Sequence, residues 1–295
     1  MINEGWKPRL QDVSLFMSAG ADVRVQLMRL DEIDPVISGN KWFKLKRTVL
    51  YAKRFSLPTV VTFGGAFSNH LIATAAAAHQ YGLKAHGIVR TEPENASNPT
   101  LSACKALGMS LYFVSRDSYR RKTAPHFAEE IIPGLQVHYL IPEGGADLAG
   151  REGAAEIAAF LPAGATHVAV SVGTGTTLAG LCNAADGLRY LGYCATSRCY
   201  EQEAAIRDWI QREAASIQLF PDEQFGGFGK WNDALLHFIR DFYGSTGIPL
   251  DVVYTAKMMY RLREQIDAGL VPAGSNIVCI HTGGLQGNPA GLFGA

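Results

Sequence analysis

The sequence predicts an α/β fold in which mainly parallel sheets are flanked by helices. Short apolar segments alternate along the 295 residues with longer segments of helical periodicity, and that alternation is typical of β-α-β units. Some apolar segments, such as 168–170, contain no polar residue, as expected of strands that helices cover on both faces. Glycine-rich turns follow two of these segments and precede helical ones, which is where α/β proteins bind ligands.

The predicted strands are the short apolar segments, and the predicted helices are the longer periodic segments between them. Strands are expected at 23–27, 59–63, 85–89, 111–114, 137–141, 167–172 and 276–281. Helices are expected at 41–50, 71–81, 101–107, 153–160, 178–190, 204–216 and 256–268. Residues 216–234 are expected to be irregular, because Gly226, Gly227 and Gly229 stand close together.

The composition argues against several classes of protein. Hydrophobic residues make up 47% of the chain and charged residues 18%, which is ordinary for a globular protein. Basic and acidic residues number 27 each and the pI is about 7.1, so no basic surface is expected to attract nucleic acid or a membrane. Residues 1–8 lack the apolar run of a signal peptide, and no segment approaches the ~20 apolar residues of a membrane span. A cytoplasmic protein is expected.

The cysteines are expected to be free thiols. Their number is odd and no two of them have CxxC spacing, which suits a reducing cytoplasm. They also form no ligand-spaced group with histidine, so no metal site is predicted. The five residues are Cys104, Cys182, Cys194, Cys199 and Cys279.

A lysine after a glycine–asparagine turn is the first candidate functional residue. Lys41 ends the sequence Ser-Gly-Asn-Lys at 38–41, and a helical run begins with it. The positive end of the helix dipole favours the neutral amine there, and a neutral lysine amine attacks carbonyl groups to form a Schiff base. The alternative is an ordinary exposed lysine, as most lysines are, but two further motifs weigh against it.

The second motif, Gly-Gly-Ala-Phe-Ser-Asn-His at 64–70, lies between a predicted strand and a predicted helix. Backbone N–H groups at such a helix start are free to hold an anion, and Ser68 and Asn69 add a hydroxyl and an amide. A substrate carboxylate is the natural ligand. The alternative is that Ser68 or Asn69 only caps the helix, which does not exclude ligand binding.

The third motif, Ser-Val-Gly-Thr-Gly-Thr-Thr at 171–177, also joins a predicted strand to a predicted helix. Its glycines let the backbone curl around a phosphate, and its threonine hydroxyls complete the loop. No Gly-Lys-Ser/Thr follows, so it is not a Walker loop, and the third glycine of a dinucleotide fingerprint is not at the required spacing. The motif suits a cofactor with a single phosphate.

Together the motifs offer a Schiff-base lysine, a carboxylate-binding turn and a monophosphate loop, a combination that pyridoxal 5′-phosphate (PLP) satisfies. The chain resembles the fold-type II PLP enzymes of the tryptophan synthase β-like superfamily. Within them it resembles the family of D-cysteine desulfhydrase and 1-aminocyclopropane-1-carboxylate (ACC) deaminase. The resemblance extends from residue 38 to 284 and includes Ile-Pro-Glu-Gly-Gly at 141–145, Val-Tyr-Thr-Ala-Lys at 253–257 and His-Thr-Gly-Gly at 281–284.

The resemblance implies a role for each matching residue. Lys41 corresponds to the lysine that binds the cofactor as a Schiff base and then moves the α-proton. Ser68 corresponds to a serine that binds the substrate carboxylate and is a proposed nucleophile in deaminases, and Tyr254 to an active-site tyrosine near the substrate. Asn69 corresponds to the residue that hydrogen-bonds the phenolic oxygen of the cofactor, and Thr282 to the hydroxyl that faces its pyridine nitrogen. The phosphate loop corresponds to Gly173, Thr174, Gly175, Thr176 and Thr177.

Two positions favour β-elimination over the opening of a cyclopropane ring. ACC deaminases carry a glutamate directly after the tyrosine, where Thr255 stands here. A neutral hydroxyl from Thr255 or Thr282 leaves the ring a weaker electron sink, and elimination of a thiolate asks less of that sink. His70 matches the histidine of desulfhydrases where deaminases have glutamine, although it also fits a supporting role beside the substrate-binding residues. The expected reaction converts a D-cysteine-like amino acid to a 2-oxo acid, ammonia and a leaving group such as sulfide.

The chain also departs from the family pattern. Phe228 stands where characterised members have a second tyrosine, Phe43 and Phe67 replace an arginine and a glutamine, and the region before Gly226 is shorter. These changes suggest a divergent subgroup, and Phe228 and Phe43 keep open a PLP-binding protein whose catalysis has lapsed. ACC deamination is the other alternative. A nicotinamide-dependent dehydrogenase is a further alternative for the glycine loop, but it predicts an acidic residue about 20 residues beyond the loop, and 191–196 contain none.

The resemblance implies a large PLP-binding domain, 1–54 and 146–295, with a smaller α/β domain, 55–145, inserted into it and the cofactor between them. No linker of biased composition separates the two domains, which agrees with an insertion. The resemblance also implies a homodimer. The expected partner is a small amino-acid substrate.

Overall fold

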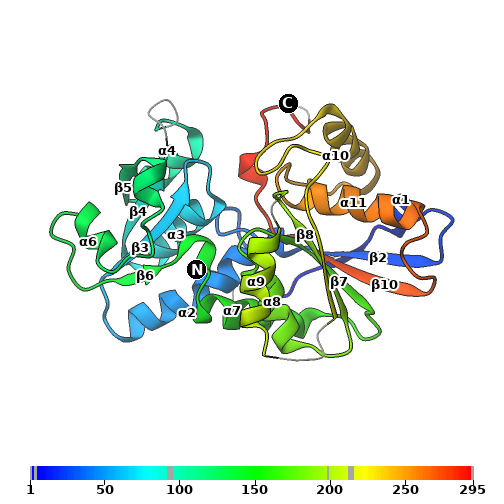
Figure 1. The fold of residues 1–295 in the computed structure, drawn as a ribbon, viewed down its shortest axis with the longest axis horizontal. Helices are drawn as coiled ribbons and strands as arrows, with labels where there is room; N and C mark the ends of the chain where they lie inside the picture. Colours follow the sequence, from blue (N-terminus) through cyan, green and yellow to red (C-terminus); the bar gives the residue numbers. More distant parts are fainter. Residues whose placement is uncertain (1, 3–4, 92–95, 198, 212–215, 294–295) are drawn as a thin grey trace. The chain divides into compact units, whose positions relative to one another are not determined.

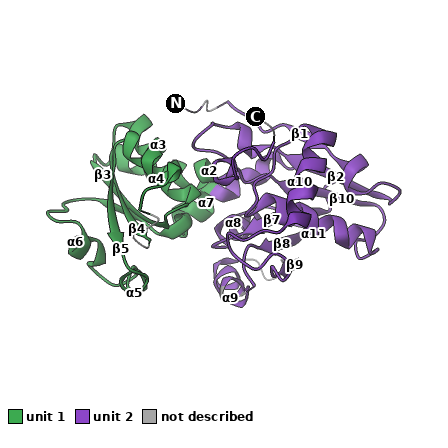
Figure 2. Cartoon of the chain, turned by 90° about the horizontal axis from the view of Figure 1, so that it is seen from above, with its two compact units in different colours: residues 1, 41–153 green, residues 2–40, 154–295 purple. Residues whose placement is uncertain are grey.

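The architecture comes from a computed structural model (Figure 1) that describes residues 2, 5–91, 96–197, 199–211 and 216–293. The described chain forms two compact units (Figure 2). Unit 1 is Lys41–Gly153, and unit 2 joins Ile2–Asn40 to Ala154–Ala295.

Unit 1 is wider than the predicted inserted domain, 55–145, because two helices at its ends pack on each other. These are α2 (Asn40–Arg54) and α7 (Leu148–Ala155). A Cβ on Gly153 of α7 would overlap the carbonyl oxygen of Phe43 in α2, so the backbones touch. Arg47 and Glu152 form an ion pair of 2.7 Å between the same helices.

Unit 2 is built on a six-stranded sheet in the order β1-β2-β10-β7-β8-β9. All neighbouring strands are parallel except β1 and β2. Strands β7 and β10 are buried along almost their whole length, as central strands covered on both faces must be. The strands are β1 (Leu10–Asp12), β2 (Val23–Met28), β7 (His167–Val172), β8 (Arg189–Cys194), β9 (Ser216–Phe220) and β10 (Ser275–Ile280).

Helices cover both faces of this sheet (Figure 1). One face carries α1 (Ser14–Met17), α10 (Asp233–Thr246) and α11 (Thr255–Asp267), and the other carries α8 (Thr176–Ala184) with α9 (Tyr200–Trp209). An aromatic cluster joins α1 to α10, with the ring of Phe16 at 5.6 Å from Phe238 and 5.2 Å from Phe242. Four short 3-10 helices complete the described chain: η1 (Leu30–Glu32), η4 (Glu156–Phe160) and η5 (Leu285–Gly287) in unit 2, and η3 (Glu143–Gly145) in unit 1.

Unit 1 contains a parallel four-stranded sheet in the order β5-β4-β3-β6. Its strands are β3 (Thr59–Gly65), β4 (Lys84–Arg90), β5 (Met109–Val114) and β6 (Tyr139–Ile141). Helices α3 (Asn69–Tyr81) and α4 (Pro99–Ala106) pack against the sheet and each other. Further helices are α5 (Arg116–Tyr119) and α6 (Phe127–Ile131), whose buried Tyr119 and Phe127 pack on Phe63 of β3.

The seven predicted strands correspond to β2, β3, β4, β5, β6, β7 and β10. The predicted α/β class with mainly parallel sheets is therefore confirmed. The helices predicted at 41–50, 71–81, 101–107 and 256–268 correspond to α2, α3, α4 and α11, and the one predicted at 153–160 is divided between α7 and η4.

The helix predicted at 178–190 is wrong beyond residue 184. Helix α8 ends at Ala184, Gly187 has a φ of +72° that turns the chain, and β8 begins at Arg189. The hydroxyl of Tyr190 in β8 donates to the carbonyl oxygens of Leu181 (3.0 Å) and Ala185 (2.7 Å). It thus caps the C-terminal end of α8, where the carbonyl oxygen of Leu181 also accepts the N–H of Ala185 at 3.2 Å.

The elements expected from the sequence differ most from the observed ones in the second half of unit 2. The helix predicted at 204–216 is observed as Tyr200–Trp209, residues 212–215 lie outside the described part, and Ser216 already belongs to β9. The segment expected to be irregular, 216–234, therefore begins with a strand, and the sequence did not predict α10. Strand β9 has a mixed burial pattern, so it lacks the continuous apolar run that marked the central strands.

The expectation of five free thiols is wrong for one pair. Cys194 at the end of β8 and Cys199 form a disulfide, because the bend between them brings positions five apart in the sequence together. The other three, Cys104, Cys182 and Cys279, are free and buried. Burial raises the pKa of the Cys104 and Cys182 thiols to about 12, which makes them poor nucleophiles at neutral pH.

Within the described residues, no helix is long and apolar enough to cross a membrane. The same residues contain no group of three or more histidine, cysteine, aspartate or glutamate side chains arranged to hold a metal ion.

We predict that Tyr190→Phe lowers the free energy of unfolding by about 1 to 2 kcal/mol, because the hydroxyl donor shared by the carbonyl oxygens of Leu181 and Ala185 is lost. Urea denaturation followed by circular dichroism measures the change. Tyr243→Phe is the matched control, since Tyr243 is 37% exposed and its ring packs on Phe293. Equal stability of the two variants would contradict the capping role of the Tyr190 hydroxyl.

Candidate active site

Lys41 is the second residue of α2, directly after a tight turn in unit 2. Gly39 in this turn has a φ of +67°, and its N–H donates to the carbonyl oxygen of Leu30 at 3.1 Å. A Cβ on Gly39 would overlap the backbone of Thr282, and a Cβ on Gly283 would lie 2.6 Å from Ser38 Oγ. The turns at 38–39 and 282–283 therefore touch backbone to backbone, which only glycine permits at these two positions.

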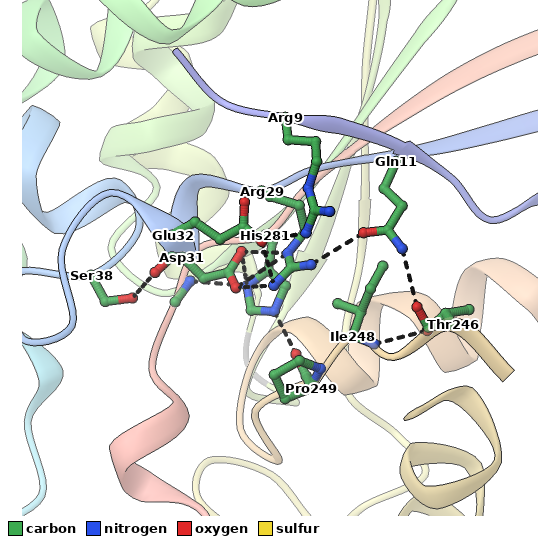
Figure 3. A network of polar contacts seen from close by, with 11 residues as sticks. Arg9, Gln11, Arg29, Asp31, Glu32, Ser38, Thr246, Ile248, Pro249 and His281 are labelled. Atoms are coloured by element: carbon green, nitrogen blue, oxygen red, sulfur yellow. Dashed lines mark hydrogen bonds and ion pairs between the residues drawn. The ribbon is translucent and has the colours of Figure 1, made fainter. Parts of the chain in front are cut away.

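A buried polar network supports both turns (Figure 3). The guanidinium of Arg29 donates to the carboxylate of Asp31 at distances of 2.7 to 3.2 Å, and both side chains are almost fully buried. Burial alone would lower the pKa of Arg29, but the hydrogen bonds and charge of Asp31 outweigh it and raise that pKa. Ser38 Oγ donates to the backbone oxygen of Asp31 at 3.2 Å, which ties the first turn to this ion pair.

His281 links the same network to the second turn. Its Nδ1 accepts the N–H of Gly283 at 3.2 Å, so its Nε2 carries the proton that is donated to the carbonyl oxygen of Pro249 at 2.8 Å. Nδ1 also lies 3.6 Å from Asp31 Oδ1. The ring acts as a fixed spacer that sets the position of Thr282.

The phosphate-loop motif forms the start of α8. Gly175 is the N-cap residue, with a φ of +84°, and a Cβ there would overlap the side chain of Ile206 in α9. In the described part of the chain no side chain caps this helix, so its first N–H groups have no side-chain acceptor. Thr174 Oγ1 and Thr176 Oγ1 lie 2.8 Å apart. An uncapped helix start lined by hydroxyls fits a phosphate group.

Asn40 connects this loop to the turn before Lys41. Its Nδ2 donates to Thr177 Oγ1 at 2.8 Å, and both residues are buried. The two positions are separated by 137 residues in the sequence. The hydrogen bond thus fixes the residue that precedes the candidate lysine relative to the candidate phosphate site.

Tyr254 lies beside the phosphate loop at the start of α11. Its hydroxyl is 3.6 Å from the position that a Cβ on Gly173 would occupy. Asp251 holds this helix start, accepting the N–H groups of Tyr254 (2.8 Å) and Thr255 (2.8 Å). The hydroxyl of Thr255 is buried and has no hydrogen-bond partner within the described residues.

In unit 1, Ser68 is the N-cap residue of α3. Its Oγ accepts hydrogen bonds from the N–H groups of His70 (3.2 Å) and Leu71 (3.3 Å). Its own N–H donates to the carbonyl oxygen of Gly65 at 3.0 Å. The capping alternative considered for Ser68 is thus observed. Because two N–H groups occupy the lone pairs of Oγ, the hydroxyl hydrogen is what remains to contact a ligand. Asn69, the other candidate here, is the first residue of α3 and is partly buried.

His70 is 3% exposed and ties α3 to the sheet of unit 1. Thr62 Oγ1 donates to Ile141 at 3.0 Å, so it accepts from His70 Nε2 at 2.9 Å, and Nε2 carries the ring proton. Burial, and then the charges of Lys44 and Lys41, lower the pKa of His70 to about 3. This geometry supports the reading in which His70 holds the substrate-binding turn in place, and a direct role in binding substrate stays a prediction.

Lys44 is a buried lysine that sequence reasoning missed. It lies three residues after Lys41 in α2, is 5% exposed, and donates from Nζ to the carbonyl oxygen of Gly144 at 3.1 Å. Burial, and then the charge of Lys41, hold the pKa of Lys44 well below its usual range. The only sequence signal was its helical spacing from Lys41, which does not distinguish a buried lysine from an exposed one.

Comparison with known proteins identifies the family. The family described as "Pyridoxal-phosphate dependent enzyme" matches residues 16–283. The chain belongs to this family. It is 31% identical to a putative ACC deaminase of Pyrococcus horikoshii, over 96% of this chain and 90% of that protein, and 27% identical to a D-cysteine desulfhydrase of Salmonella choleraesuis, over 94% and 89%. The solved structure of an ACC deaminase homologue superposes with a TM-score of 0.79 at 27% identity, covering 96% of this chain and 90% of that one.

These findings confirm the family resemblance, the fold-type II class and the PLP cofactor. They also confirm that the protein is a PLP-dependent enzyme of the lyase and deaminase type. The roles of single residues stay predictions. In the PLP enzyme, the uncapped start of α8 and its threonines would hold the phosphate, and Lys41 would supply the amine that binds the cofactor aldehyde.

We predict that Gly39→Ala destabilises the PLP enzyme by about 1 to 3 kcal/mol more than Gly20→Ala does, because its Cβ would overlap Thr282. Gly20 is the matched control, since its φ of +82° imposes the same backbone strain but no atom lies within 4 Å of its Cβ. Urea denaturation of both variants measures the difference. Equal losses of stability in the two variants would mean that the turns at 38–39 and 282–283 can move apart without a cost in free energy, which would contradict the prediction.

We predict that His70 makes the stability of the PLP enzyme fall as the pH is lowered from about 6.5 towards about 3. The folded state keeps the ring neutral while the unfolded state binds a proton, so the slope is about 1.4 kcal/mol per pH unit for this group. Chemical denaturation of wild type and His70→Gln at several pH values measures it. Identical slopes in the two proteins would show that the folded state protonates His70 normally.

Proposed function

We propose that the PLP enzyme catalyses β-elimination from a small D-cysteine-like amino acid, giving a 2-oxo acid, ammonia and the leaving group, which is sulfide for D-cysteine. The observation that carries this proposal is the hydrogen bonding of Ser68. Its Oγ already accepts two N–H groups of α3, which suits a donor to the substrate carboxylate better than a nucleophile. Elimination needs no serine nucleophile, whereas ring opening by serine attack does.

Each catalytic candidate has a defined task in this proposal. When bound, PLP supplies an electron sink for the charge that develops at the α-carbon of the substrate. Ser68 donates its hydroxyl hydrogen to the substrate carboxylate and orients it. Lys41 would hold the cofactor through its amine and would act as the general base that removes the α-proton of the substrate. Tyr254 protonates the leaving group, and the released aminoacrylate hydrolyses to the 2-oxo acid and ammonia.

Other candidates are proposed to hold the cofactor. Gly173, Thr174, Gly175, Thr176 and Thr177 bind its phosphate at the start of α8, and Asn69 hydrogen-bonds its phenolic oxygen. The hydroxyl of Thr282 faces the pyridine nitrogen. A neutral partner at that nitrogen leaves the sink weak, which suits substrates with a good leaving group.

ACC deamination is the second candidate, because the Pyrococcus relative and the superposed structure are both named for it. It requires a nucleophile or base that attacks the cyclopropane ring, and Ser68 is engaged as a helix cap. A PLP-binding protein without catalysis is the third reading, supported by the phenylalanines at 43 and 228. We also propose a homodimer, on the strength of the family resemblance, and a cytoplasmic location, which the three free cysteines support.

We predict that the purified enzyme has a visible absorption band that disappears in Lys41→Ala, while Lys46→Ala in the same helix keeps it. We further predict that pyruvate forms from D-cysteine and β-chloro-D-alanine, with kcat/KM about a thousandfold lower in Lys41→Ala because the general base is lost. Absorbance and keto-acid assays with L-cysteine, D-serine and ACC complete the comparison.

Each possible result supports or contradicts one of these proposals. Formation of 2-oxobutyrate from ACC would favour the deaminase. A band without product from any of the amino acids would favour lapsed catalysis. Absence of the band after addition of PLP would contradict the assignment of Lys41. Sedimentation of the holoenzyme as a monomer would contradict the homodimer.

A further inference from the structure

Asp222 organises the glycine-rich loop that follows β9. Its carboxylate accepts the N–H groups of Phe225 (3.0 Å) and Gly227 (3.1 Å), and its own N–H donates to Thr196 after β8 at 3.0 Å. The Asp222 side chain is 3% exposed. A buried carboxylate therefore anchors the loop, which includes three glycines with φ between 70° and 94°, Gly226, Gly227 and Gly229.

Lys257 of α11 closes this loop from the other side. Its Nζ donates to Asp222 Oδ2 at 2.7 Å and to the carbonyl oxygen of Gly227 at 2.8 Å, and its side chain is 5% exposed. The ammonium also lies 5.7 Å from the ring centre of Phe225, which packs on Tyr260 of α11. One buried lysine thus holds both ends of the 222–227 segment against the helix.

The loop and α11 each carry one ring of an aromatic pair. Phe228 directly follows Gly227, and Tyr254 lies three residues before Lys257. Their rings meet edge to face, with centres 6.0 Å apart, and Phe228 is 56% exposed. Tyr254 rests in turn against Gly173 of the phosphate loop. The position of Phe228 relative to the phosphate loop is therefore set through Lys257.

A buried ion pair adds little to stability when well-packed apolar residues are the alternative, so a need for fixed geometry explains this pair better than stability does. The exposed ring that it holds in place has no hydroxyl. Beside the phosphate loop, the aromatic pair therefore presents one hydroxyl, from Tyr254, and one apolar edge, from Phe228.

We propose that the ion pair of Lys257 and Asp222 is a specificity device that holds Phe228 against Tyr254 and thereby directs the enzyme to amino acids with an apolar β-substituent that leaves as a stable anion. Lys257 is a positioning residue in this arrangement and acts through Phe228. The inference rests on the proposed β-elimination and narrows its substrate class to β-thiol and β-halogen amino acids, against β-hydroxyl ones.

The chemistry of the leaving group explains the selectivity. In the elimination the α-proton passes to Lys41, the bond from Cβ to the substituent breaks, and its electron pair leaves on the substituent. A thiol has a pKa of about 8.5, so thiolate leaves readily, as chloride does, and needs little of the proton transfer proposed for Tyr254. Hydroxide is the conjugate base of water, with a pKa of about 15.7, and must be protonated as it leaves; in the aromatic pair it depends on Tyr254 alone, because Phe228 supplies no second hydroxyl. An apolar phenyl edge favours contact with sulfur or chlorine and gives no proton to oxygen.

The test compares selectivity, defined as kcat/KM for β-chloro-D-alanine divided by kcat/KM for D-serine, in the holoenzyme and its variants. Lys257→Met alone leaves a buried unpaired carboxylate and is expected to fold poorly, so the main variant combines Lys257→Met with Asp222→Asn. We expect its selectivity to fall roughly three- to tenfold, mainly through a higher KM for β-chloro-D-alanine, the size expected for one aromatic contact. Phe228→Ala is expected to cause the same loss.

A double-mutant cycle gives the decisive readout. If Lys257 acts through Phe228, adding Phe228→Ala to the Lys257→Met/Asp222→Asn variant causes no further loss of selectivity. Amide hydrogen exchange of residues 223–230, measured by mass spectrometry, is expected to be faster in that variant than in wild type. The control is Asp267→Asn in the same helix, which weakens an ion pair of 3.8 Å between the 64% exposed Asp267 and Arg263 and is expected to change neither quantity.

The outcomes separate this inference from the proposed function. Wild-type selectivity or wild-type exchange in the Lys257→Met/Asp222→Asn variant would overturn the inference while β-elimination stands. Selectivity losses that multiply in the cycle would also overturn it, because Lys257 would then act independently of Phe228. Absence of turnover in the wild-type holoenzyme with every substrate would refute the proposed function, and this inference with it.

Discussion

The contact between two glycine turns is the constraint on which unit 2 depends. The turn at 38–39 and the turn at 282–283 approach so closely that a Cβ on Gly39 or Gly283 would collide with the opposite turn. The ion pair of Arg29 with Asp31 supports one side and the ring of His281 the other (Figure 3). Asn40 directly follows the first turn, and its side chain donates a hydrogen bond to Thr177. The contact between the turns therefore also fixes the start of α2 relative to the phosphate loop.

The chemistry of the PLP enzyme is set largely by how its helices begin. Helices α3, α4 and α10 are capped by Ser68, Asn98 and Asn232, and Asp251 accepts the N–H groups at the start of α11. Helix α8 begins at Gly175 without a side-chain cap. The start of α8 therefore has N–H groups available to an anion, whereas a capped start such as α3 offers a ligand the hydroxyl hydrogen of its cap.

Two buried lysines, Lys44 and Lys257, distinguish this chain from a generic α/β protein. Lys44 is held by a carbonyl oxygen alone in the described structure, and its lowered pKa follows from burial and from Lys41. Lys257 has a carboxylate partner and a carbonyl partner, so it keeps a fixed geometry. Lys44 thus lies near the reactive amine of Lys41. In our proposal, Lys257 holds the aromatic pair that contacts the substrate.

The sequence by itself determined the α/β class, the family, the cofactor and the three motifs, because these depend on patterns within a few neighbouring residues. A glycine turn after an apolar strand, or a lysine at a helix start, is visible locally and keeps its meaning in the folded protein. The same local reasoning failed at Tyr190, where a helical pattern runs into a buried strand, and at β9, which lacks a continuous apolar run.

Only the tertiary structure decided which polar groups are partners. Lys257 and Asp222 are 35 residues apart, Lys44 and Gly144 are 100 apart, and Asn40 and Thr177 are 137 apart. The residues that neighbour each of these positions in the sequence do not indicate its hydrogen-bond partner. The tautomers of His70 and His281 likewise follow from acceptors that other strands and loops bring to them. Hydrogen bonds and burial between distant segments exist only once the sheets have formed, and they turn these motif residues into defined sites.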